Sequence, residues 1–72
     1  MNPYEELANA IILQAVKDYR RALKLLSRNP HSHSALAAVN EMERFFRSEW
    51  YETLTPVNGE MLIRKLREEA SL

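Results

Sequence analysis

The chain has 72 residues, no cysteine, and ten basic and ten acidic side chains. Its length predicts one small domain spanning residues 1–72, and the lack of cysteine excludes disulfides and thiolate metal sites. The net charge of zero gives no argument from the whole-protein field for a nucleic-acid or membrane partner. Because a domain of this size buries only about 60% of its unfolded surface, we expect marginal stability.

The two halves of the chain differ in charge. Residues 1–30 carry five bases and three acids, a net charge of +2, and residues 31–72 carry five bases and seven acids, a net charge of −2. Such halves can pair within one chain or between copies. Glu5 and Glu6 stand where a signal peptide needs positive charge, and no apolar run is long enough to cross a bilayer. We therefore expect a cytoplasmic protein without membrane contact.

Residues 3–27 have the pattern of one long helix. Asn2 is a good N-cap, and Pro3 suits the first helical position. Apolar residues recur close to the helical period through the segment, and Pro30 disfavours its continuation. The expected rod of about 37 Å is too long for one short helix to cover.

A second helix is predicted over residues 32–52, with Ser32 or Ser34 as its cap. The short connection makes it an antiparallel neighbour of the first helix. Its expected buried stripe consists of Ala35, Leu36, Val39, Met42 and Phe46, and leads to Trp50.

The third predicted helix covers residues 58–70. Asn58 can cap it, and Thr55 before Pro56 is the competing start. Acidic and basic residues four apart are expected to pair on its outer side: Glu60 with Arg64, Arg64 with Glu68, and Lys65 with Glu69. The sequence thus predicts an all-α three-helix bundle whose short last helix closes the core.

Four aromatic residues gather at the end of the second predicted helix: Phe45, Phe46, Trp50 and Tyr51. Neighbours on a helix point about 100° apart, so one residue of each adjacent pair can be buried. We expect Phe46 and Trp50 in the core and Tyr51 nearer the surface. Arginine and tyrosine are typical of interface hot spots. Arg44, Arg47 and Tyr51 are therefore the candidate contacts to a protein partner, unless all four rings simply form core.

Five basic residues of the first helix are spaced so that they share one face: Lys17, Arg20, Arg21, Lys24 and Arg28. Such a row can follow the phosphates of a nucleic acid. It is equally typical of the solvated back of an amphipathic helix. A third interpretation is that it attracts an acidic protein surface.

No catalytic or cofactor-binding motif is present. The sequence has no P-loop, glycine fingerprint or HExxH motif. His31 and His33 lie in the expected turn without the further ligands that a metal site needs. We therefore expect neither enzymatic activity nor a cofactor or metal.

The segments AIILQAVKDYRRALKLL, RNP and ERFFRSEWYETLTPVNGEMLIRKLREE together cover nearly the whole chain. In this combination the chain resembles short helical proteins of unknown function encoded in prophages and integrative elements of Clostridia-like bacteria. The resemblance implies a mobile-element setting, in which small proteins often bind and regulate host proteins or inhibit host defences such as CRISPR nucleases. It assigns no role to any residue.

Three functions follow as hypotheses. The first is a non-enzymatic protein-binding module that regulates or inhibits a host protein. The second is a nucleic-acid-binding accessory protein that uses the basic face of the first helix. The third is a helical homo-oligomer, a homodimer for instance, in which another copy covers the long first helix.

Overall fold

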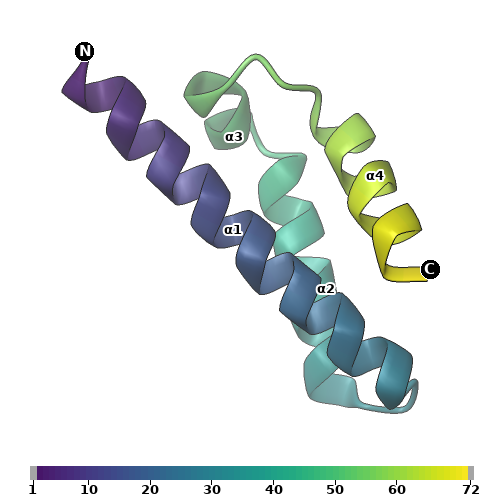
Figure 1. Cartoon of the computed structure of the whole chain (residues 1–72). Helices are drawn as coiled ribbons and strands as arrows, with labels where there is room; N and C mark the ends of the chain where they lie inside the picture. The colour runs from purple at the N-terminus through teal and green to yellow at the C-terminus, as the bar shows by residue number, and fades with distance from the viewer. Residues whose placement is uncertain (1, 72) are drawn as a thin grey trace.

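The computed structural model describes residues 2–71, in which every regular element is a helix. In chain order these helices are α1 (Pro3–Arg28), α2 (His33–Phe46), α3 (Glu49–Leu54) and α4 (Gly59–Ser71) (Figure 1). The prediction of an all-α fold is confirmed. The arrangement differs from the expected three-helix bundle, because the segment predicted as one helix over residues 32–52 forms two.

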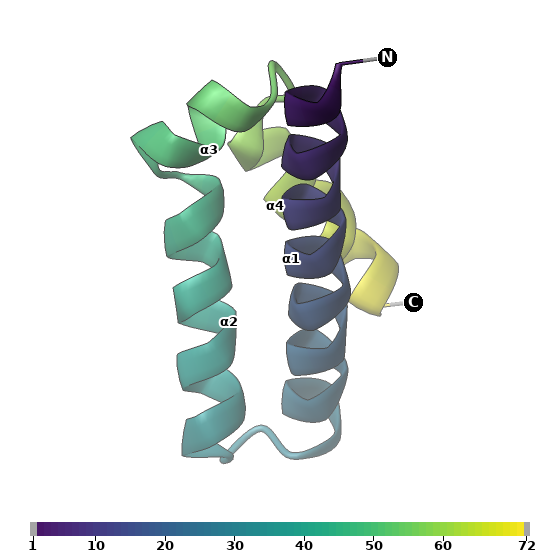
Figure 2. The ribbon, with the colours of Figure 1, turned by 90° about the vertical axis from the view of Figure 1, so that its left-hand side faces the viewer.

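The boundaries of α1 and α2 follow from their caps. The Asn2 side chain accepts a hydrogen bond from the Tyr4 backbone N–H at 2.9 Å, and Pro3 begins the helix. Ser32 caps α2 by accepting from the Ala35 backbone N–H at 3.2 Å. The tight connection between them makes α1 and α2 antiparallel neighbours (Figure 2), as the sequence predicts.

Ser48 separates α2 from α3. Its hydroxyl donates a hydrogen bond to the Phe45 carbonyl at 2.6 Å and accepts one from the Tyr51 backbone N–H at 3.1 Å. The Ser48 side chain therefore satisfies a backbone carbonyl at the C-terminal end of α2 and a backbone N–H at the N-terminus of α3. The chain changes direction here, and α3 crosses the end of the α1–α2 pair (Figure 2).

This change of direction reverses the expected burial of two aromatic side chains. Trp50 is 58% exposed and Tyr51 is 1% exposed, so the prediction of a buried Trp50 and a more exposed Tyr51 is wrong. An unbroken helix would have placed Trp50 one turn after Phe46 on the same face. Because the helix restarts after Ser48, Tyr51 takes the inner position and packs edge-on against Phe46, with ring centroids 5.7 Å apart. Phe46 is buried, as predicted.

The core lies where α4 packs across α1 and α2. Ile63 and Leu66 of α4 are buried against side chains from the other three helices. These buried core residues are Ala15, Tyr19, Ala22, Val39, Phe46 and Tyr51. Asn58 caps α4, as predicted, by accepting a hydrogen bond from the Met61 backbone N–H at 2.9 Å.

At Gly59 the backbone of α4 approaches the end of α2 closely. A Cβ atom at this position would overlap the carbonyl oxygen of Phe46 and lie 3.4 Å from the Tyr51 ring. The conformation of Gly59 itself is ordinary, since its φ is not positive. Close backbone approach, rather than conformational freedom, therefore requires glycine here.

Replacing Gly59 by alanine tests this contact. Gly59→Ala is expected to lower the free energy of unfolding by about 1–3 kcal/mol, because α4 must move away from α2. Within a helix, the same substitution ordinarily raises stability by up to ~1 kcal/mol. Urea unfolding followed by circular dichroism measures the sign directly, and a stabilised variant would contradict the close approach.

Candidate functional site

The predicted partner-binding residues do not share one surface. Tyr51 is buried and offers no ring to a partner. Arg44 and Arg47 are exposed, but the Arg47 guanidinium bonds both oxygens of the Glu60 carboxylate from α4. Arg47 therefore links α2 to α4 rather than standing ready for another molecule.

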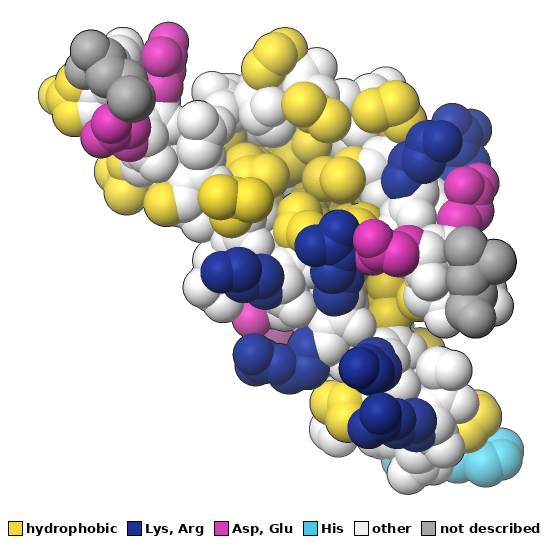
Figure 3. Space-filling view, in the orientation of Figure 1, with side chains coloured by type: hydrophobic (Ala, Val, Ile, Leu, Met, Phe, Trp, Pro, Cys, Tyr) yellow, Lys and Arg dark blue, Asp and Glu magenta, His cyan; other side chains and the backbone are white. Residues whose placement is uncertain are grey.

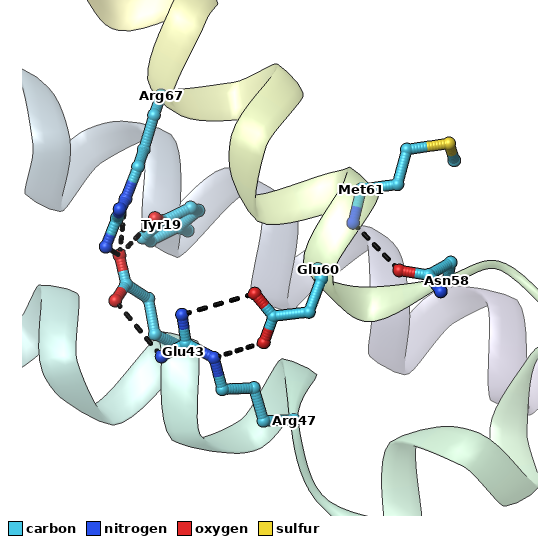
Figure 4. A network of polar contacts seen from close by, with 7 residues as sticks. All are labelled: Tyr19, Glu43, Arg47, Asn58, Glu60, Met61 and Arg67. Atoms are coloured by element: carbon cyan, nitrogen blue, oxygen red, sulfur yellow. Dashed lines mark hydrogen bonds and ion pairs between the residues drawn. The ribbon is translucent and has the colours of Figure 1, made fainter.

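A buried carboxylate joins three helices. Glu43 of α2 is only 5% exposed. Its Oε2 accepts hydrogen bonds from the Tyr19 hydroxyl of α1 at 2.6 Å and from Arg67 Nε of α4 at 2.9 Å (Figure 4). Its Oε1 lies 3.5 Å from Arg47 Nη1. The Glu43 carboxylate thus has partners on both oxygens, as a buried charge requires.

The environment of Glu43 stabilises its charged form. Burial alone raises the pKa of Glu43, but the hydrogen bonds from Tyr19 and Arg67 and the nearby positive charges outweigh it, so this pKa lies below its usual range. Burial and then the bond to Glu43 raise the pKa of Tyr19 to about 12. At neutral pH the group is therefore a carboxylate held by a neutral phenol and two guanidinium groups.

The burial of Glu43 was not predicted, although the sequence contains a signal for it. Position 43 lies four residues after Val39 and three before Phe46, and both of these neighbours are buried. A carboxylate on the apolar stripe of an amphipathic helix needs partners from other helices. The arrangement has no exposed reactive atom, so we interpret it as a structural anchor that fixes the register of α1, α2 and α4.

Two of the three carboxylates of α4 pair with other helices. Glu60 bonds Arg47, and Glu69 binds Arg20 of α1 through two hydrogen bonds of 2.7 and 3.1 Å. Among the ion pairs of residues 2–71, the pairs predicted within this helix do not occur. The distant arginines prevail because each presents two N–H groups to both carboxylate oxygens.

The basic face of α1 is at the surface. All five predicted residues are exposed: Lys17, Arg20, Arg21, Lys24 and Arg28. Among these five residues, Arg20 alone forms an ion pair with a residue that the structure describes. Lys and Arg side chains occupy much of the lower half of the view in Figure 3.

Apolar side chains gather beside this basic face, over the N-terminal half of α1 and the beginning of α4 (Figure 3). Leu13 and Val16 share the side of α1 that carries Arg20, and Leu62 shares the side of α4 that carries Glu69. Val16 and Leu62 pack against the buried core, whereas Leu13 remains at the surface.

The ribbons of α1 and α4 lie farther apart at the first turn of α4 than at its last (Figure 1). Leu13 is 60% exposed, and Met61 in the first turn of α4 is 42% exposed. We call this surface the apolar patch; it consists of Leu13 and Met61 together with the half-buried Val16 and Leu62. The sequence analysis did not single it out, although Leu13 is a large apolar residue off the buried stripe of α1.

Neither a metal site nor a membrane span is found among the described residues. His31 and His33 are both exposed, and the His, Asp and Glu side chains of residues 2–71 form no group of three that could hold a metal ion. Over the same residues, none of the helices combines the length and apolar character needed to cross a bilayer.

Comparison with protein-family models, curated proteins and solved structures finds no match to this chain.

Two tyrosine-to-phenylalanine variants separate the roles of the buried hydroxyls. Tyr19→Phe removes a hydrogen bond to the buried Glu43 carboxylate and is expected to lower the free energy of unfolding by about 1.5–3 kcal/mol. The Tyr51 hydroxyl is buried without a partner among the described residues. Tyr51→Phe is therefore expected to leave stability unchanged or raise it by up to ~1 kcal/mol. Equal losses in both variants would contradict the anchor.

The lowered pKa of Glu43 predicts an acid-sensitive contribution to stability. In the unfolded chain a glutamate titrates near pH ~4.3, above its value in the folded chain. The contribution is therefore present above that pH and is lost as the pH falls through the folded pKa. Between about pH 5 and pH 3, the free energy of unfolding of the unaltered chain should fall more steeply than that of Glu43→Gln. Urea titrations across this range measure both slopes, and parallel slopes would refute the prediction.

Proposed function

We propose that this chain is a non-enzymatic protein-binding module that regulates or inhibits the protein it binds. The observation that carries the proposal is the apolar patch. It combines the exposed side chains of Leu13 on α1 and Met61 on α4 with the half-buried Val16 and Leu62, on a face where apolar side chains gather (Figure 3). Clustered exposed apolar side chains, unlike single ones, are characteristic of interaction sites.

The patch lies next to groups that can orient a partner. Lys17 follows Leu13 by one turn of α1, and Arg20 follows Val16 in the same way. Apolar contact surrounded by charge is the usual composition of a protein interface, in which the centre provides affinity and the rim provides orientation. In the mobile-element setting that the sequence resemblance implies, the partner would be a host protein.

Nucleic-acid binding by the basic face is the second candidate. The exposure of Lys17, Arg21, Lys24 and Arg28 on one side of α1 favours it. Phosphate contacts would use these charges and leave the neighbouring apolar patch in water. We therefore rank this candidate below protein binding, which uses both surfaces.

A pair of matched leucine variants tests the proposal. Leu13→Glu places a charge in the apolar patch, whereas Leu25→Glu places one on the same helix, about 120° around its axis and ~18 Å along it. The two leucines have similar exposures of 60% and 50%. In affinity purification from a bacterial host extract, we expect a protein retained by the unaltered chain and by Leu25→Glu to be lost with Leu13→Glu.

The same variants distinguish the second candidate. Retention unaffected by Leu13→Glu would count against the patch as a binding surface. Binding to a DNA duplex that weakens steeply with salt and is abolished by Lys17→Glu, with Leu13→Glu unaffected, would favour nucleic-acid binding instead.

A further inference from the structure

A second exposed apolar group lies on α3. Trp50 is 58% exposed and touches Phe45 edge-on, with ring centroids 5.5 Å apart. Its neighbours Glu49 and Glu52 are exposed as well. The short helix α3 therefore presents one large ring next to the negative charge of Glu49, while Glu52 lies about 200° around the helix from Trp50. Tryptophan is the residue type most enriched among interface anchors, so an exposed position needs an explanation.

The surface of α3 complements the apolar patch. The patch has the positive charge of Lys17 one turn of α1 from Leu13, and α3 has the negative charge of Glu49 directly before Trp50. We propose that the occupant of the apolar patch in the free protein is a second copy of this chain, whose Trp50 packs on Leu13 and whose Glu49 faces Lys17. This inference rests on the proposed function, because it assigns a partner to the same patch.

The large exposed area of the chain supports the inference that a partner covers part of its surface. The chain exposes 5542 Å², whereas a folded monomer of 8.4 kDa is expected to expose about 4,600 Å². The excess of about 900 Å² is close to the ~800 Å² that each partner contributes to a standard interface. Part of the excess comes from the elongated shape, with extents of 42 × 21 × 20 Å.

A twofold axis would close the pair. The helix α3 and the N-terminal half of α1, which carries Leu13, both lie toward the end of the molecule where the chain begins (Figure 1). Two copies joined at this end make the patch-to-α3 contact twice, which leaves neither surface free. The net charge of zero removes overall repulsion between the copies.

The test uses the full chain and its single tryptophan. Analytical ultracentrifugation from micromolar to millimolar concentration should give twice the mass of one chain, and Trp50 emission should shift to the blue over the same range. Leu13→Glu and Trp50→Ala should each weaken self-association about tenfold or more, as interface anchors do, while Leu25→Glu leaves it unchanged. Circular dichroism shows whether each variant keeps its helices.

Charge reversal provides the sharper control. Lys17→Glu should weaken the dimer, and combining it with Glu49→Lys should restore the dimer, because the facing charges are then exchanged. A chain that stays monomeric at millimolar concentration overturns the inference. So does self-association that Leu13→Glu leaves unchanged, or a mass well above that of two copies.

The failure of this inference can be separated from that of the proposed function. A monomer from which Leu13→Glu still removes a host protein in affinity purification means that the patch binds a different protein. A dimer that depends on Leu13, with no host protein lost in that variant, means that self-association is the only binding the patch performs.

Discussion

The buried carboxylate of Glu43 is the constraint on which the arrangement of the helices depends. A charge inside a small core is tolerated only when all its partners are in place, and these partners come from Tyr19 of α1 and Arg67 of α4. The apolar contacts would permit several helix offsets, because they are not directional. The hydrogen bonds at Glu43 select one offset of α1, α2 and α4.

The sequence was informative where the determining contact is local. Asn2, Ser32 and Asn58 cap the helices that they were predicted to cap, because a cap depends on residues within one turn. Ser48 has the same chemistry but stands within a run of helical periodicity, so the break was missed. Because the helix break at Ser48 was not predicted, Trp50 was expected in the core and Tyr51 nearer the surface, which is the reverse of their observed positions.

The candidate site was less predictable because its contacts are distant in sequence. Arg20 and Glu69 are 49 residues apart, and Glu43 is 24 residues from both Tyr19 and Arg67. Regular spacing along one helix predicts neighbours four residues apart and gives no information about such pairs. The apolar patch likewise exists only because α1 and α4 diverge, which no single segment encodes. The basic face of α1 was predictable, since one helix carries all of it.

The close backbone approach that Gly59 permits has a consequence for the ionic contacts between α2 and α4. The separation between α2 and α4 is set where the Gly59 backbone meets the Phe46 carbonyl. Arg67 and Glu60 stand on the same rigid helix and reach back to Glu43 and Arg47 across that separation. The close approach at Gly59 therefore sets the distance between α2 and α4. This distance determines the lengths of the hydrogen bonds that Glu60 and Arg67 form with α2. A methyl group added at residue 59 would therefore change the electrostatic environment of the Glu43 carboxylate, although the two groups are not in contact.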